Sequence, residues 1–127
     1  MYRFVGVVRE REGLSKAQKE ITDLKEWAID DLRIANGKIF NYDQIHALEM
    51  FNMLDLCQVI VKAALMREES RGAHCRRDCP DLNNKEWFKN IIFQRQDDKL
   101  LWKTERVKTP YVTFSEEHDH ERKSGKN

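Results

Sequence analysis

The sequence has few of the residues that interrupt helices, with two prolines and five glycines among 127 residues. Proline and glycine mark turns and helix ends, so their scarcity favours long helices over a turn-rich all-β fold. No apolar run approaches the roughly 18 residues of a membrane-spanning helix. The first residues contain neither a long apolar segment nor a small-residue cleavage site, so we expect no signal peptide.

An excess of charge of one sign is also missing. Lys and Arg number 23 against 22 Asp and Glu, which gives a formal net charge of +1. A charge so balanced provides no overall field for nucleic acid or an anionic membrane, and we expect neither nucleic-acid binding nor direct membrane insertion. The three cysteines are an odd number, and Cys57 lies in an apolar helical run. This predicts free thiols in a reducing, cytoplasmic compartment.

A first helix is predicted to begin near Leu14, after Gly13. Apolar residues recur there at spacings of three and four, as one buried stripe requires. The stripe consists of Leu14, Ala17, Ile21, Leu24, Ala28 and Leu32. Residues 36–38 form a predicted turn, in which Gly37 is the natural place for a positive φ.

A second helix is predicted from Tyr42 to about Ser70, with Asn41 or Asp43 as its cap. Its helical period is held by Ile45, Leu48, Met53, Leu56, Ile60, Ala63 and Ala64. Residues 54–66 are apolar on most faces, so we expect this helix to be central, with neighbours on more than one side. Gly72 is the candidate C-cap residue at its end.

The C-terminal part predicts smaller elements. A short helix can start near Asn83, and segments 91–94 and 100–107 can pair as a hairpin across an Asp97-Asp98 turn. The predicted fold is therefore mainly α: a bundle of about three helices with a long central helix and a short C-terminal β-hairpin. We assign residues 1–114 to this helical domain and residues 115–127, which are almost all polar or charged, to a disordered tail.

One segment has an unusual composition for a helix end. Residues 67–81 read Arg-Glu-Glu-Ser-Arg-Gly-Ala-His-Cys-Arg-Arg-Asp-Cys-Pro-Asp, followed shortly by Trp87. This resembles the C-terminal helical domain of succinate dehydrogenase and fumarate reductase flavoprotein subunits, in which a long helix ends in Glu-Ser-Arg-Gly-Ala-His. Residues 5–9, Val-Gly-Val-Val-Arg, and residues 52–65 extend the resemblance, which covers about residues 1–107. Cys75 and Cys79 stand where the family usually has Tyr and an aromatic residue.

The resemblance implies an accessory domain of an FAD-dependent subunit that oxidises succinate or reduces fumarate by hydride transfer at the flavin. Its implied partners are the upstream flavin-binding and capping domains and an iron–sulfur subunit, in the cytoplasm or at the cytoplasmic face of a membrane. The sequence has no Gly-x-Gly-x-x-Gly pattern. We therefore expect FAD to be held by the parent subunit, and this chain to have no catalytic, flavin or substrate site and no activity alone. The isolated domain could self-associate through Phe4, Val5 and Val7.

The candidate site is a set of charged residues at the end of the second helix: Arg67, Glu68, Glu69, Arg71, His74, Arg76, Arg77 and Asp78. We interpret them first as an ion-pair and hydrogen-bond cluster that fixes the following loop. The alternative is an interface that seats the domain on the flavin domain or the iron–sulfur subunit. Direct contact with flavin or substrate is the third interpretation.

Several other hypotheses stay open. His74, Cys75 and Cys79, with His46, His118 or His120, invite a zinc site, but the spacing lacks the two tight ligand pairs of structural zinc, and we expect no metal. Cys75 and Cys79 could also form a redox dithiol, without the usual Cys-x-x-Cys spacing. The function could instead be that of a free-standing helical interaction module, or of the C-terminal domain of an L-aspartate oxidase, which usually has Leu at the position of Ala73.

Overall fold

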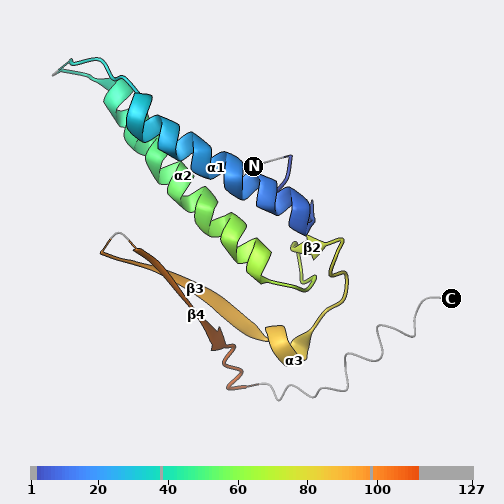
Figure 1. The fold of residues 1–127 in the computed structure, drawn as a ribbon. Helices are drawn as coiled ribbons and strands as arrows, with labels where there is room; N and C mark the ends of the chain where they lie inside the picture. The colour runs from blue at the N-terminus through green and yellow to red at the C-terminus, as the bar shows by residue number, and fades with distance from the viewer. Residues whose placement is uncertain (1–2, 38, 98, 112–127) are drawn as a thin grey trace.

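The computed structural model describes residues 3–37, 39–97 and 99–111, in which a helical hairpin lies beside a β-hairpin (Figure 1). The elements in chain order are β1 (Val8–Arg9), α1 (Arg11–Asp31), α2 (Tyr42–Met66), β2 (Cys75–Arg76), α3 (Asn84–Trp87), β3 (Lys89–Gln96) and β4 (Lys99–Arg106). This confirms the predicted mainly α fold, although the third helix is a single turn. The predicted tail, residues 115–127, lies outside the described residues. No helix in the described segments is long and apolar enough to cross a membrane.

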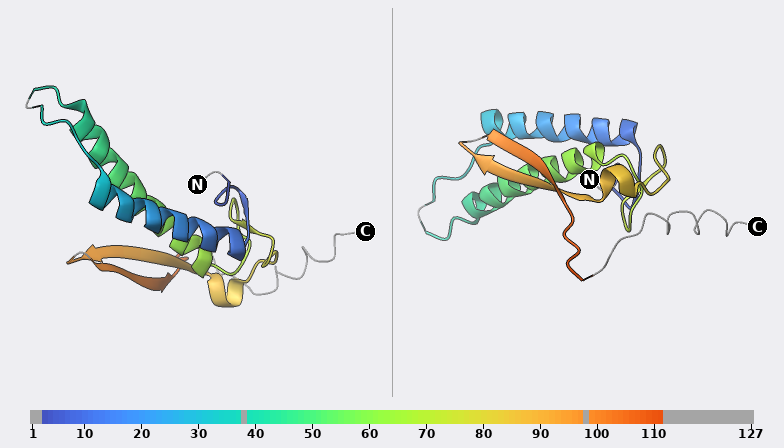
Figure 2. Two further views of the ribbon diagram at one scale, coloured as in Figure 1. Left: turned by 45° about the horizontal axis from the view of Figure 1, so that its top comes forward. Right: turned by 90° about the horizontal axis from the view of Figure 1, so that it is seen from below.

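The main core lies between α1 and α2, which run side by side in opposite directions (Figures 1 and 2). Its buried apolar residues are Leu14, Ala17, Ile21 and Ala28 from α1, and Ala47, Leu54, Val61 and Ala64 from α2. Four of these eight are alanines, whose small side chains let the two helices pack closely. Four of the six residues of the predicted stripe of α1 are buried, whereas Leu24 is 46% exposed and Leu32 lies just beyond the end of the helix.

Most of the predicted stripe of α2 does not face α1, and Ala64 is its one buried member. Leu48, Met53 and Leu56 are 59–60% exposed, and Ile45 is 50% exposed. The contact is made instead by Ala47, Leu54 and Val61, on the opposite side of the helix. Because α2 is apolar on most faces, its own periodicity cannot select the buried one; the single stripe of α1 makes that choice.

Three predicted local features differ in the structure. Helix α2 ends at Met66 rather than near Ser70, because the backbone of Arg67 is extended. Gly72 has a φ of 57°, but it lies in the loop beyond the helix rather than at its C-cap. The positive φ expected at Gly37 occurs at Phe40, with a φ of 52°.

Asn41 closes the loop between the two long helices. Its side-chain Nδ2 donates to the carbonyls of Ala35 at 2.7 Å and Gly37 at 2.9 Å. Its Oδ1 accepts from the backbone N–H of Gln44 at 3.1 Å, so the predicted cap is Asn41 and not Asp43. This bond satisfies one of the first N–H groups of α2, which have no partner within the helix.

Helix α2 has neighbours on two sides, as expected of a central helix: it packs against α1, and the β-hairpin lies beside the two long helices (Figures 1 and 2). Strands β3 and β4 are antiparallel, with Phe93 opposite Trp102, and Asp98 of the predicted turn lies outside the described residues. Asp55 of α2 joins the three layers. It pairs with Lys25 of α1 and, at 2.9 Å, with Arg95 of β3.

We expect Leu54→Ala to lower the free energy of unfolding by about 2–5 kcal/mol, because it leaves a cavity between α1 and α2. Leu48→Ala, on the uncovered side of the same helix, should change it by less than about 0.5 kcal/mol. Urea denaturation followed by far-ultraviolet circular dichroism measures both. Equal losses for the two variants would contradict the assignment of the buried face.

Candidate functional site

The loop that follows α2 turns back on itself within a few residues. The backbone N–H of Arg71 donates to the carbonyl of His74 at 2.8 Å, and the reverse bond measures 3.0 Å. The φ of 57° at Gly72, between them, is a conformation that glycine adopts without steric cost. The turn directs the chain into β2, which pairs in parallel with β1 near the N-terminus.

Ser70 fixes the far side of this loop. Its backbone N–H donates to the carbonyl of Asp81 at 3.1 Å. Its hydroxyl accepts from the backbone N–H of Arg76 at 2.8 Å and donates to the carbonyl of Cys79 at 2.8 Å. One small side chain therefore satisfies polar backbone groups on two strands of the loop, as buried peptide groups require.

Glu69 is fully buried, at 0% exposure, and is the central acceptor of the cluster. Its Oε1 accepts from Nη1 of Arg67 at 2.6 Å and Nε of Arg71 at 2.8 Å. Its Oε2 accepts from Nη2 of Arg71 at 2.9 Å and from the backbone N–H of Asn83 at 3.0 Å. Arg71 therefore binds this carboxylate through two parallel bonds, the strongest arrangement of such a pair.

Arg76 is the second fully buried charged residue, also at 0% exposure. Its Nε donates to Oδ1 of Asp78 at 2.8 Å, and its Nη2 donates to Oδ2 of the same carboxylate. Its Nη1 donates to the carbonyls of Ala64 at 2.8 Å and Arg67 at 3.1 Å. These carbonyls lie at the C-terminus of α2, where they lack helical partners and where the helix dipole attracts a cation.

The electrostatics of the cluster favour its charged forms. The hydrogen bond from Arg76 lowers the pKa of Asp78 to about 2, against an ordinary value of 3.8. Burial by itself raises the pKa of Glu69, but the bonds from Arg71, Asn83 and Arg67 outweigh burial and leave this pKa below its ordinary value. The hydrogen bond to Asp78 raises the pKa of Arg76 despite its burial.

The imidazole of His74 forms a hydrogen bond within the fold. Its Nε2 lies 3.2 Å from the carbonyl oxygen of Arg67, and since a carbonyl only accepts, Nε2 carries the proton. Burial lowers the pKa of His74, and the positive charges of Arg9 and Arg76 act in the same direction. A neutral ring that donates to a helix-end carbonyl fits this environment.

The structure brings together most of the predicted cluster and separates two members. Arg67, Glu69, Arg71, His74, Arg76 and Asp78 interact around the end of α2. Glu68 pairs instead with Arg11 at the start of α1, and Arg77 is exposed and lines a different hollow.

The cluster also contains several residues that the pattern of charges in the sequence did not predict. Ser70 and Asn83 bond as described above, and Asn84 accepts from Nη2 of Arg71 at 2.7 Å. Trp87 lies beneath two cations, at 5.3 Å from Arg67 and 4.6 Å from Lys89. In the sequence, Ser70 lies within residues 67–81 and the others follow them, but no local pattern shows their contacts, because these depend on how the loop closes.

The thiols and imidazoles do not gather into a metal site in the described parts of the chain. No group of three or more His, Cys, Asp and Glu residues there has the arrangement to hold an ion. Cys57, Cys75 and Cys79 are free thiols. His118 and His120 lie outside the described residues.

Comparison with known sequences identifies relatives for almost the whole chain. The family model described as fumarate reductase flavoprotein C-term matches residues 1–122. A fumarate reductase flavoprotein subunit of Mycobacterium tuberculosis is 36% identical over 100 residues, which are 76% of this chain and 16% of that protein. A succinate dehydrogenase flavoprotein subunit of Rickettsia bellii is 37% identical over 93 residues, or 72% of this chain and 15% of that protein.

Solved structures give the same result. A quinol fumarate reductase of E. coli matches with a TM-score of 0.81 and 25% identity, over 89% of this chain and 20% of that one. The Sdh1 complex of Mycobacterium smegmatis matches with a TM-score of 0.75 and 27% identity, over 88% of this chain and 19% of that one. The chain thus spans a fifth or less of the length of these proteins.

We expect Glu69→Gln to lower the free energy of unfolding by about 3 kcal/mol or more, because it leaves two arginines beside a buried neutral amide. The neighbouring exposed pair offers a matched control: Glu68→Gln should cost less than about 1 kcal/mol. Chemical denaturation of both variants measures the difference. Similar costs at the two positions would show that burial of Glu69 contributes little.

Asp78→Asn should remove part of the acid sensitivity of the fold. The pKa of Asp78 is about 2 in the folded chain, against an ordinary value of 3.8. Ionised Asp78 therefore stabilises the fold fully above pH 3.8, and this contribution is lost as the pH falls through about 2. The urea midpoint of the wild type should therefore fall more steeply in this window than that of Asp78→Asn. Asp23→Asn, on the exposed surface of α1, should behave as the wild type; parallel curves for all three would contradict the assignment.

Proposed function

This chain belongs to the family of C-terminal domains of fumarate reductase flavoproteins, and from that premise we propose that it is the accessory domain of an FAD-dependent subunit that oxidises succinate or reduces fumarate. The relatives named above are succinate dehydrogenase and fumarate reductase proteins, which are oxidoreductases. Upstream flavin-binding and capping domains of the same polypeptide are the proposed partners.

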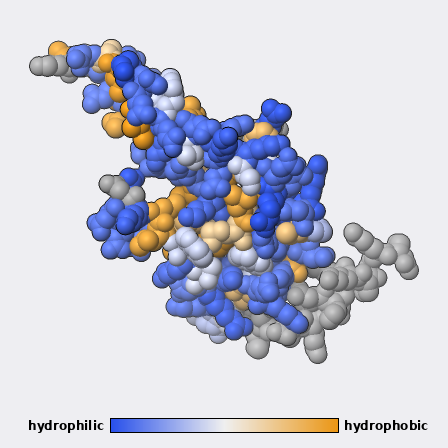
Figure 3. All heavy atoms as spheres, viewed as in Figure 1, coloured by the Kyte–Doolittle hydropathy of each residue, from blue (hydrophilic) through white to orange (hydrophobic). Residues whose placement is uncertain are grey.

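The observation that carries this proposal is the apolar face of α2 turned away from α1. Ile45, Leu48, Met53 and Leu56 lie on it, each half or more exposed. Figure 3 shows hydrophobic residues among hydrophilic ones over the helical hairpin and on the neighbouring β-hairpin, where Leu101 is 47% exposed. Burying a leucine or methionine side chain contributes about 1.5–3 kcal/mol, so leaving this face in water is costly. A face of this kind is expected where a domain packs against a larger protein.

The N-terminal residues supply less of this surface than the sequence indicated. Phe4 and Val5, predicted as exposed, pack partly buried against the core, and only Val7, at 65%, is largely exposed. Any self-association of the isolated chain would therefore use the apolar face of α2 that is turned away from α1, which we call the outer face of α2. We propose such self-association only for the chain without its partner domains, in which that face has no other cover.

The described residues do not fit FAD. A dinucleotide site needs a glycine-rich turn between a strand and a helix, and the sequence has no Gly-x-Gly-x-x-Gly pattern. The two larger hollows, of about 410 and 550 Å³, have no glycine in their lining, and the hollow at the start of α1, of about 160 Å³, has only Gly13. We therefore propose that the parent protein holds FAD in its upstream part, and that the present chain supplies no catalytic residue.

The charged cluster has a structural role in this proposal. Its buried members are paired with one another and with the end of α2, which supports a role in fixing the loop rather than in contacting flavin or substrate. The exposed edges of the cluster are the second candidate for contact with the flavin domain or an iron–sulfur subunit. The free thiols support a reducing, cytoplasmic location, including the cytoplasmic face of a membrane.

The experiment mixes this chain with the separately expressed upstream domains and measures complex formation, the flavin spectrum and fumarate reduction by a reduced dye. We expect a stoichiometric complex with restored activity, and no activity of this chain alone. Succinate and aspartate as alternative substrates distinguish a succinate dehydrogenase from an L-aspartate oxidase. Failure to associate would favour the free-standing interaction module.

Leu56→Lys should abolish this complex while the chain stays folded, because it places a charge on the outer face of α2 where contact is proposed. Glu20→Lys, an exposed charge change on α1, is the matched control and should bind normally. Size-exclusion chromatography of the mixtures, with circular dichroism of each variant, checks both points. Normal binding by Leu56→Lys would remove the outer face of α2 from the interface.

A further inference from the structure

The loop between α1 and α2 has exposed apolar side chains at the end of the helical hairpin. We call these residues the apolar tip: Ile34, Ile39, Phe40 and Tyr42, which are 42%, 80%, 83% and 61% exposed. We propose that the ring of Phe40 is an anchor that inserts into an apolar pocket of the upstream domains of the parent protein. This inference rests on the accessory role proposed above and adds a specific residue to that contact.

The apolar tip lies away from the other elements of the described chain. Helix α1 has 21 residues, so a rise of about 1.5 Å per residue places the tip about 30 Å from the charged cluster at the other end of the helical hairpin. Figures 1 and 2 show the loop projecting past the β-hairpin. The described part of the chain therefore leaves the tip largely uncovered.

The backbone of Phe40 has a conformation that is rare for a bulky residue. Its φ of 52° lies in the left-handed region, where Cβ crowds the backbone and glycine is favoured. The carbonyl of Phe40 accepts from the backbone N–H of Tyr42 at 2.9 Å, and the side chain of Asn41 bonds to the carbonyls of Ala35 and Gly37. Strained residues of this kind cluster at binding and active sites, where the strain preorganises a contact.

A phenyl ring in this position suits a protein contact better than it suits the isolated fold. At 83% exposure, the ring of Phe40 makes little contact with the rest of the chain. Aromatic side chains are enriched in the buried centres of protein interfaces, where they supply a large apolar area. A loop already fixed by hydrogen bonds loses little conformational entropy when the ring is buried.

The surface beside the tip indicates which partner covers it. Tyr42 and Ile45 are three residues apart on α2 and lie on one side of the helix, and Leu56 lies on the same side three turns farther along. All three are half or more exposed. The apolar tip therefore continues the outer face of α2, and a protein that covers this face also reaches Phe40. The upstream domains are the partner proposed for that face.

The charges around the tip favour a protein partner over a membrane. Residues 30–43 contain three carboxylates, from Asp30, Asp31 and Asp43, against two cations, from Arg33 and Lys38. A segment that binds an anionic membrane surface needs an excess of basic residues instead. We therefore expect the receiving pocket to be apolar inside and to have basic residues at its rim.

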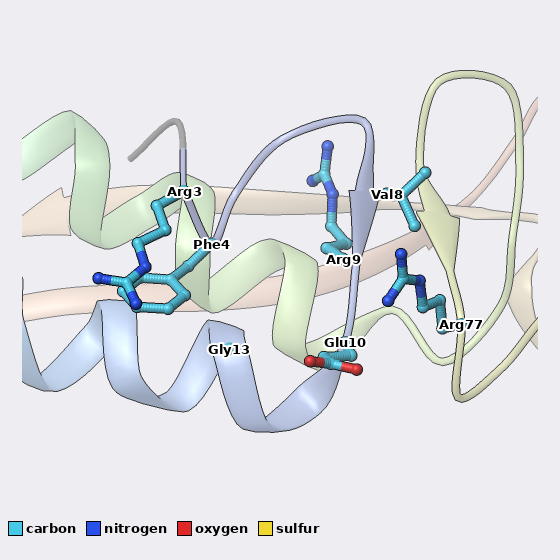
Figure 4. Close-up of a pocket in the computed structure, with 7 residues that line it drawn as sticks. All are labelled: Arg3, Phe4, Val8, Arg9, Glu10, Gly13 and Arg77. Atoms are coloured by element: carbon cyan, nitrogen blue, oxygen red, sulfur yellow. The ribbon is translucent and has the colours of Figure 1, made fainter.

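The hollow at the start of α1 offers no comparable site. Figure 4 shows that the guanidinium groups around it, from Arg3, Arg9 and Arg77, do not converge on one point. Nε of Arg9 donates to the carbonyl of Gly6 at 2.9 Å, and Arg3 lies over the ring of Phe4 at 5.1 Å. These side chains make contacts within the fold instead of facing one ligand.

The test measures the binding of this chain to the separately expressed upstream domains by isothermal titration calorimetry. We expect Phe40→Gly to weaken binding at least about tenfold, because it removes the anchor. The thermal midpoint of the variant alone should not fall, since glycine adopts a φ of 52° without steric cost. Tyr111→Gly, which removes a residue that is 96% exposed beyond β4, is the matched control and should bind as the wild type.

A second variant, Phe40→Ala, separates the loss of the ring from the greater backbone freedom of glycine. It should weaken binding to a similar extent, because it also lacks the ring. Equal binding by the wild type and both variants would overturn the anchor and leave the accessory role standing, whereas no binding by the wild type would overturn both. Binding of the wild type to phosphatidylglycerol vesicles, abolished in Phe40→Ala, would assign the tip to a membrane and overturn the protein pocket.

Discussion

The buried guanidinium of Arg76 is the interaction on which the rest of this fold depends. It closes the C-terminus of the longest helix by donating to carbonyls of Ala64 and Arg67, while Asp78 compensates its charge. The same residue pairs with Arg9 in the parallel contact of β2 with β1. A single side chain thus joins the end of α2, the following loop and the N-terminal segment. Because the guanidinium is wholly buried, the loss of any of these contacts would leave a buried charge without its full set of partners, which is strongly destabilising.

Glu69 is the buried negative charge of this region, as Arg76 is its buried positive charge. It gathers Arg67, Arg71 and the backbone of Asn83 onto one carboxylate, and so connects the end of α2 to the start of α3. A buried ion pair of this kind adds little net stability compared with apolar residues of the same volume, since desolvation offsets the attraction. Its value is geometric: two bidentate carboxylate–arginine pairs allow only one path for the loop between Arg67 and Asn83.

This rigid end contrasts with the outer face of α2. The helix is anchored by α1, by the Asp55 ion pairs and by the charged cluster, and yet much of its apolar surface stays in water. Rigid presentation of an uncovered apolar face is what an element of a larger assembly requires, because little conformational entropy is lost when the face is covered.

The sequence by itself determined the family, the two long helices and the hairpin, because each depends on local periodicity or an ordered motif. It offered both Asn41 and Asp43 as the cap of the second helix, and the structure selected Asn41. Only the tertiary structure decided which face of α2 is buried, since a helix apolar on most sides has no preferred face until α1 selects it. The tertiary structure also decided that Arg76 is buried and that Arg77 is exposed. Successive residues of an extended segment point to opposite sides, so the remote pairing of β2 with β1, which sets Arg76 opposite Arg9, leaves Arg77, just beyond β2, on the other side.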